Sequence, residues 1–179
     1  PDIDPLHFGL LQAVTALIGL SPSHTVLYPG CHRHITPSLF YPSVTYVDNY
    51  AKLREFYLDP AVYTWVQENK KYPEPAKMLY ACQNFEKPLP AQFGGLQSFD
   101  LMISASAGII STVCYDYLKQ GDGYLLVSDA HFDATEAFLH PEIYEPVAFW
   151  DRNSLQTDTT RFNEFFLVAT KGNKSKEAK

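Results

Sequence analysis

The sequence predicts a single three-layer α/β domain built on a mostly parallel sheet of seven strands. Short apolar runs rich in β-branched residues, such as TVLY at 25–28 and SVTYVD at 43–48, are typical of buried strands. Stretches with helical spacing of apolar residues lie between these runs, and such alternation favours a parallel sheet covered on both faces. No linker or repeat divides the 179 residues, a length that suits one core.

In the first half of the chain, residue patterns predict the helices and strands of this fold in order. Apolar residues at positions 6, 10, 14, 17 and 18 predict an N-terminal helix within residues 1–22. Thr36-Pro37 starts a short helix that Tyr41-Pro42 stops, so the connection between the first two strands is brief. Asp59-Pro60 has the residue types of a helix N-cap and first position. The expected order is a helix at 1–22, strands at 25–28 and 43–48, helices at 51–58 and from 60, and a strand at 76–85.

The second half continues the alternation and ends in an antiparallel pair. We expect strands at 99–106 and 123–130, separated by an amphipathic helix over 108–123 that Gly121 closes. Asp133 and Glu136 have the spacing of a capping box that opens another short helix. The last two strands, 145–150 and 161–172, have no helix between them and should pair antiparallel. The core of the domain then spans 24–171, and residues 172–179 form a flexible tail.

Composition and charge restrict the possible partners and location. A hydrophobic share of 46% with 19% charged residues is typical of a soluble globular protein. The net charge of −6 argues against a nucleic-acid partner. The apolar stretch at 8–20 is too short to cross a bilayer and has no basic start, so we expect no membrane association. Three isolated cysteines predict a reduced, cytoplasmic protein.

The arrangement of strands and turns resembles the class I S-adenosylmethionine-dependent methyltransferases, which have a Rossmann-like fold. The likeness runs from about His24 to Lys171. More narrowly, LYPG followed by PSLFYPSVTYVD resembles a bacterial group of methyltransferase-like proteins in which a YPG turn precedes a PS-x-x-x-P-x-VTYVD stretch. The resemblance implies S-adenosylmethionine as cofactor.

The turn after the first strand departs from the pattern of that family. Tyr28 stands where the family has an acid, and Gly30 stands at the first glycine. His32 and His34 stand at the later glycine positions, where a side chain narrows the methionine end of the pocket. Asp48 matches the acid that accepts hydrogen bonds from the ribose hydroxyls, although an aspartate there can also cap the following helix.

The later strand ends carry weaker matches. Asn84 offers an amide to an adenine edge or forms a turn. Ser104 begins a run of small residues, 104–108, which in the family lines the cleft or else allows tight packing. The Asp-Pro-Pro-Tyr or Asn-Pro-Pro-Tyr pattern of amino-directed methyltransferases is absent from the sequence. The resemblance thus implies a cofactor site made of Tyr28, Pro29, Gly30, Asp48, Asn49, Asn84 and Ser104.

A second chemistry competes at the same edge of the sheet. Residues of metal-ligand type follow the first and fifth strands: Cys31, His32, His34, Asp129, His131 and Asp133. The histidines His32, His34 and His131 could hold a metal, or they could be ordinary surface or hydrogen-bonding residues. His131 is also the first candidate for a general base.

Three functions follow from these patterns. The first is an S-adenosylmethionine-dependent methyltransferase that acts on a small molecule. The second is a non-catalytic binding protein that kept the fold and lost the cofactor, and the third is a metal-dependent hydrolase that uses the histidines.

Overall fold

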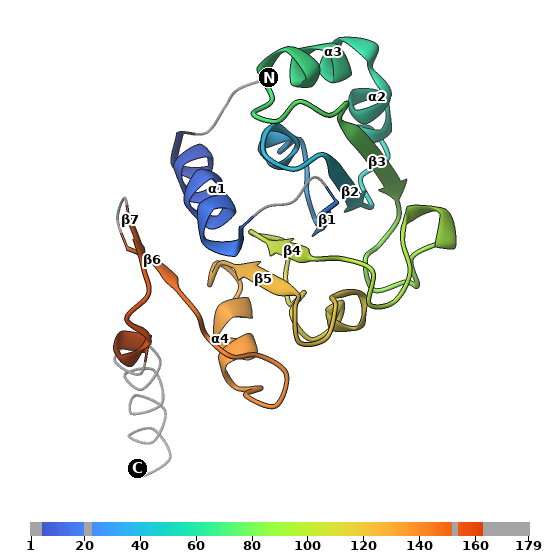
Figure 1. Ribbon diagram of the computed structural model, residues 1–179. Coiled ribbons are helices and arrows are strands. Elements are labelled where there is room, and N and C mark those ends of the chain that lie inside the picture. Colours follow the sequence, from blue (N-terminus) through green and yellow to red (C-terminus); the bar gives the residue numbers. More distant parts are fainter. Residues whose placement is uncertain (1–4, 20–22, 152–153, 163–179) are drawn as a thin grey trace.

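The computed structural model describes residues 5–19, 23–151 and 154–162 (Figure 1). The helices are α1 (Pro5–Ile18), α2 (Leu53–Leu58), α3 (Pro60–Asn69) and α4 (Asp133–Phe138), with 3-10 segments at Thr36–Leu39, Ala91–Phe93, Tyr115–Tyr117 and Thr159–Arg161. The strands are β1 (Thr25–Pro29), β2 (Ser43–Asp48), β3 (Lys77–Cys82), β4 (Leu101–Ser104), β5 (Tyr124–Val127), β6 (Phe149–Asp151) and β7 (Ser154–Gln156).

Five strands form one parallel sheet in the order β3-β2-β1-β4-β5. The chain first runs outward from β1 through β2 to β3, and then returns to the other side of β1 to add β4 and β5. The order therefore reverses between β1 and β4, and the fold is an α/β Rossmann-like domain. In such sheets the crevice for a ligand lies beyond the carboxyl ends of the strands at this reversal.

The register of the first three strands aligns a row of tyrosines on one face. Tyr28 of β1 is opposite Tyr46 of β2, which is opposite Tyr80 of β3. Tyr57 of α2 stacks on Tyr80 with ring centroids 4.5 Å apart and planes 7° from parallel. The aromatic residues that the sequence contains at these positions thus fix α2 against the sheet.

Helices cover this face of the sheet. Leu11 of α1, Leu53 of α2 and Val66 of α3 are at most 2% exposed and belong to one apolar cluster with the buried side chains of β1, β2 and β4. The predicted N-cap is confirmed, because the Asp59 carboxylate accepts a hydrogen bond from the Ala61 N–H at 2.8 Å. The short connection between β1 and β2 is also confirmed, as a 3-10 segment over Thr36–Leu39.

Irregular chain covers the opposite face, and the predicted helix over 108–123 is wrong. Only Tyr115–Tyr117 is helical there, as a single 3-10 turn. The backbone of residues 116–119 instead bonds to residues 97–99, as when the Phe99 N–H donates to the Tyr117 carbonyl at 3.1 Å. The apolar side chains with helical spacing, including Ile110 and Cys114, still face the core. Several residues at 109–113 are β-branched, and this lowers their helix propensity.

The terminal antiparallel pair exists, but it is separate from the parallel sheet. β6 pairs with β7 in a two-stranded sheet, so the described residues do not show the expected seven-stranded sheet. The hairpin lies against α1, where Trp150 is next to Gly9 (Figure 1). The predicted strand at 161–172 begins in a 3-10 segment that ends at Arg161, and residues from 163 onward lie outside the described part of the chain, as does the 172–179 tail.

The helix predicted from residue 133 is confirmed, but its start differs from a capping box. Phe132 occupies the N-cap position with a positive φ of 63° and makes no side-chain cap. The Asp133 carboxylate instead bonds to residues near β4, while Asp129 accepts from the Thr135 N–H at 2.9 Å. Within the described residues, no helix has the length and hydropathy needed to cross a membrane.

Candidate functional site

The carboxyl ends of β1 and β2 bring Gly30 and Asp48 together. Gly30 has a positive φ of 64°, and its N–H donates to the Val47 carbonyl at 2.7 Å, which ties the turn after β1 to β2. The Asp48 carboxylate accepts from the His32 N–H at 3.0 Å and from the Tyr50 N–H at 2.9 Å. We call residues 30–34 the β1 turn.

The Asp48 carboxylate keeps capacity for a ligand after these two bonds. Its two oxygens offer about four lone-pair sites, and two are used by backbone donors. The side chain is half-buried, and its neighbours Asn49 and Tyr50 are exposed. Asp48 does not cap α2, because Lys52 occupies the N-cap position of that helix and no side chain caps it. Asp48 instead orders the segment that leads to α2 and leaves acceptor sites at the sheet edge.

Tyr28 lies beneath this edge and does not reach it. Its side chain is 2% exposed, and its hydroxyl is 2.9 Å from Nδ1 of His34. Burial raises the pKa of the Tyr28 phenol, so the group stays neutral at all ordinary pH values. A neutral buried hydroxyl is therefore not equivalent to the carboxylate that the sequence resemblance led us to expect at this position.

The space directly above Gly30 is filled by Ala107. A Cβ placed on Gly30 would lie 1.9 Å from the Ala107 Cβ, so the two residues are already in close contact. Ala107 belongs to residues 105–111, which we call the post-β4 loop. The glycine thus serves a close approach, but in this conformation the approaching group is a neighbouring loop of the same chain.

Ser104, at the carboxyl end of β4, is held from the segment after β5. Its side chain is 2% exposed, and its hydroxyl donates to the carboxylate of Asp133, which is 1% exposed. The other Asp133 oxygen accepts from the Ser111 N–H at 3.0 Å. Ser104 is thus occupied in a buried polar cluster rather than directed at the β1 turn.

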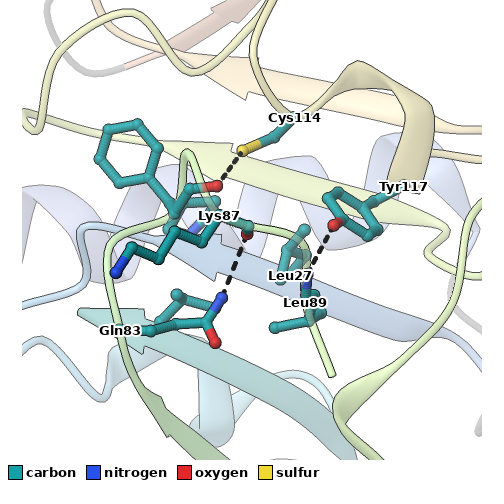
Figure 2. Close-up of a pocket in the computed structure, with 9 residues that line it drawn as sticks. Leu27, Gln83, Lys87, Leu89, Cys114 and Tyr117 are labelled. Carbon is teal, nitrogen blue, oxygen red and sulfur yellow. Dashed lines mark hydrogen bonds between the residues drawn. The ribbon is translucent and has the colours of Figure 1, made fainter. Parts of the chain in front are cut away.

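The residues after β3 form a compact loop on the face of the sheet that irregular chain covers (Figure 2). Asn84 forms a turn, because its side-chain oxygen Oδ1 accepts from the Glu86 N–H at 3.1 Å. The Leu89 N–H donates to the Tyr117 hydroxyl at 2.7 Å, and the Cys114 thiol donates to the Phe85 carbonyl at 3.8 Å. The hollow beneath this loop has a volume of about 10 Å³. That is space for about one water molecule, so the hollow does not take an adenine ring.

A second hollow lies between α1 and the carboxyl ends of β4 and β5. Its volume is about 60 Å³, and its lining includes His7, His34 and Ser104. The rings of His7 and His34 are 4.6 Å apart. This hollow lies on the helical side of the sheet, near the strand reversal. Gly30 and Asp48 do not line it, because they lie at the carboxyl-end edge of the sheet.

The three candidate histidines, His32, His34 and His131, do not come together as one metal site. His32 is exposed with a φ of 46°, His34 contacts Tyr28, and Nε2 of His131 is 3.1 Å from the Ser106 carbonyl. Because a carbonyl oxygen only accepts, Nε2 of His131 carries a hydrogen in this bond. Across the residues that the structure describes, no group of three His, Cys, Asp or Glu side chains is arranged to hold a metal ion, so the metal hypothesis gains no support.

The structure adds residues that the sequence did not single out. Ala107 closes the space over Gly30, and Ser111 and Tyr144 join the cluster around Asp133, with the Tyr144 hydroxyl donating to the Ser111 carbonyl at 2.7 Å. The run of small residues after β4 was the available signal for close packing. Nothing in the sequence indicated which turn that run would contact.

Comparisons with known proteins found likenesses in structure only. No protein-family model and no curated protein matches the chain. An S-adenosylmethionine-dependent methyltransferase from Mesorhizobium loti is 16% identical over 65% of this chain and 49% of its own, with a TM-score of 0.37. The 23S rRNA methyltransferase ErmE is 14% identical over 69% of this chain and 43% of its own, with a TM-score of 0.36.

A third structure matches over more of its length. A SAM-dependent methyltransferase from Methanosarcina mazei is 17% identical over 95% of this chain and 84% of its own, with a TM-score of 0.46. The chain spans less than half the length of the first two structures. At these identities and TM-scores, the activity of those proteins does not transfer to this chain. The assignment of the fold rests on the strand order of the sheet.

Proposed function

We propose that this chain is an S-adenosylmethionine-dependent methyltransferase that acts on a small molecule and binds the cofactor nucleoside at the edge formed by Gly30 and Asp48. The observation that carries the proposal is the position of the Asp48 carboxylate. It lies at the carboxyl end of β2, where it accepts from the His32 N–H of the β1 turn, and β1 is one of the two strands between which the strand order reverses. An acid at this place suits two vicinal hydroxyls, since one carboxylate accepts from both.

The residues fit the nucleoside in part. Asp48 retains acceptor sites for a ribose, whereas Ala107 fills the space over Gly30 in the conformation described. Binding therefore requires the post-β4 loop to move away from the β1 turn. When bound, S-adenosylmethionine supplies an electrophilic methyl group, and the chain has chiefly to align a nucleophile with it.

The test is a calorimetric titration of S-adenosylmethionine and S-adenosylhomocysteine into the wild type and Asp48→Ala. We expect both nucleosides to bind the wild type and Asp48→Ala to weaken binding about tenfold to a hundredfold, as for lost hydrogen bonds to a charged group. The matched control is Asp59→Ala, which removes a carboxylate that also caps a backbone N–H but lies at the start of α3. Equal affinities for Asp48→Ala and the wild type would contradict the proposal.

A second candidate is a binding protein without cofactor chemistry. Two observations favour it: the neutral buried Tyr28 at the position of the family acid, and the contact of Ala107 with Gly30. Its signature in the same titration is a folded wild type that binds neither nucleoside.

A further inference from the structure

The post-β4 loop covers the β1 turn and is built from small residues. Positions 105–108 read Ala-Ser-Ala-Gly, and Gly108 has a positive φ of 114°. These side chains bury little apolar surface, whereas Ile110, two residues later, is fully buried. The loop is thus anchored at Ile110, whereas residues 105–108 over Gly30 bury little apolar surface. Moving these residues away from Gly30 therefore costs little hydrophobic free energy.

Asp133 fastens both ends of this loop. One carboxylate oxygen accepts from the Ser104 hydroxyl, just before the loop, and the other accepts from the Ser111 N–H at 3.0 Å, at its end. The carboxylate is 1% exposed. Hydrogen bonds to a buried charged group are the strong ones, so this pair dominates the attachment of the loop.

The segment after β5 adds contacts along the rest of the loop. The Ser128 hydroxyl donates to the Ala105 carbonyl, and Nε2 of His131 donates to the Ser106 carbonyl at 3.1 Å. These two side chains are exposed, so each contact contributes less than the Asp133 pair. These contacts come from residues 128–133, and the Tyr144 hydroxyl adds one more at the anchored end of the loop, to the Ser111 carbonyl at 2.7 Å.

We propose that the post-β4 loop is a lid closed over the β1 turn, and that Asp133 is the latch that keeps it shut. Opening the lid removes Ala107 from Gly30 and frees the space over the β1 turn, whose His32 N–H donates to Asp48. The consequence for binding rests on the proposed function: the apparent affinity for a nucleoside is reduced by the fraction of molecules that are closed. Asp133 is a positioning residue, since it acts through the loop and not on a ligand.

The experiment measures amide hydrogen exchange in residues 105–111 of the full chain, without any ligand. We expect Asp133→Asn to accelerate exchange there about tenfold, because the amide has only one acceptor oxygen for the two donors and has no charge. The matched control is Asp129→Asn, which loses a carboxylate that bonds Thr135 in the same segment but does not touch the loop. Its exchange in 105–111 should equal that of the wild type. Unchanged exchange in Asp133→Asn, or equal acceleration in both variants, would overturn the latch.

A second variant keeps the test decisive if Asp133→Asn does not fold. The double substitution Ser128→Ala with His131→Ala removes two exposed contacts and leaves the core intact. We expect about threefold faster exchange in 105–111, in keeping with the smaller worth of exposed hydrogen bonds. Exchange equal to that of the wild type would overturn the lid.

Titration of S-adenosylhomocysteine into the same variants separates the lid from the proposed function. If both hold, affinity rises in proportion to the acceleration of exchange. Faster exchange with no nucleoside bound by any variant supports the lid and overturns the proposed function. Nucleoside binding with unchanged exchange supports the proposed function and overturns the lid.

Discussion

At the scale of single residues, Gly30 is the position where sequence and structure constrain each other most tightly. The chain needs a positive φ there, and it also needs the absence of a Cβ, because Ala107 lies against it. The two requirements are separable. A side chain at a positive φ is strained anywhere, but the clash exists only where the loop makes its contact.

Gly30→Ala should therefore destabilise the protein more than the same change at Gly19. Gly19 has nearly the same φ, 63°, but among the described residues no atom apart from its neighbours in the chain and in its own helix lies within 4 Å of its added Cβ. We expect a loss of about 1–2 kcal/mol for Gly19→Ala from backbone strain alone, and about 1–3 kcal/mol more for Gly30→Ala from overpacking. The measurement is the free energy of unfolding in urea. Ala107→Gly should recover part of the loss in Gly30→Ala, and equal losses at the two glycines would contradict the contact.

The cysteines differ in burial and therefore in reactivity. Cys31 and Cys114 are at most 2% exposed, and burial raises the pKa of each thiol to about 12, whereas Cys82 is exposed. A maleimide at pH 7 should label Cys82 at once and the other two only in denaturant, because the thiolate is the reacting form. Labelling followed by peptide mass mapping checks this, and Cys82→Ser should abolish the fast phase. Fast labelling of Cys31 in the native protein would contradict its burial.

At the scale of elements, the sequence predicted well where one residue pattern has one structural solution. The runs 25–28 and 43–48 are apolar on both faces and became β1 and β2, and Asp59-Pro60 began α3. The prediction from sequence failed at 108–123. Apolar residues with helical spacing face the core there without forming a helix, because the backbone of residues 116–119 bonds to residues 97–99 instead. That pairing joins segments whose proximity depends on the whole sheet, and local periodicity does not carry such information.

Asp100 fixes the start of β4 to the start of β1. Its carboxylate accepts from the Thr25 N–H at 2.8 Å and pairs with the Lys119 ammonium at 2.5 Å. Burial would raise its pKa, but the bonds from Lys119 and Thr25 outweigh burial and lower the pKa below its usual value. A carboxyl group with a depressed pKa stabilises the fold above its unfolded pKa, and this contribution is lost as the pH falls through the folded pKa.

We therefore expect Asp100→Asn to lower the free energy of unfolding by about 1–3 kcal/mol at pH 7. The difference from the wild type should shrink as the solution is acidified below pH ~4. Urea unfolding over a pH series measures it, with the exposed Asp122→Asn as the matched control. A difference that stays constant into acid would contradict the role of the charge.

His140, just after α4, gives a second pH dependence with the opposite sign. Nδ1 is 2.7 Å from a Glu142 oxygen, and Nε2 is 3.3 Å from Glu136 one turn earlier. These carboxylates, Glu142 first, raise the pKa of the imidazole above its usual value. The stabilisation by these pairs is complete below the unfolded pKa and is lost as the pH rises through the folded pKa.

An NMR titration of the His140 ring should show the raised pKa directly. Glu142→Gln should lower it towards the usual histidine value, while Glu145→Gln, which removes an exposed carboxylate outside these pairs, should leave it unchanged. High salt should reduce the shift, because the groups are on the surface. Equal pKa values for the wild type and Glu142→Gln would contradict the pairing.

At the scale of the whole molecule, the fold places five carboxyl strand ends on one edge and two of its loops in contact across the strand reversal. The sequence located Gly30 and Asp48 at this edge, because each directly follows or ends a recognisable strand. It could not locate the lid, because Ala107 and Asp133 reach the β1 turn and the post-β4 loop only through the order β1-β4-β5. The parts of a site that depend on strand neighbours become visible only with the sheet in hand.

The central claim is that a nucleoside binds at the edge between the β1 turn and Asp48 once the lid opens. The most direct measurement is the set of backbone amide NMR shifts of the wild type during a titration with S-adenosylhomocysteine. We expect saturable shifts at His32 and Tyr50, whose N–H groups donate to Asp48, and at residues 105–111 of the lid. An unchanged spectrum at saturating nucleoside, or shifts confined to other parts of the sheet, would contradict the claim.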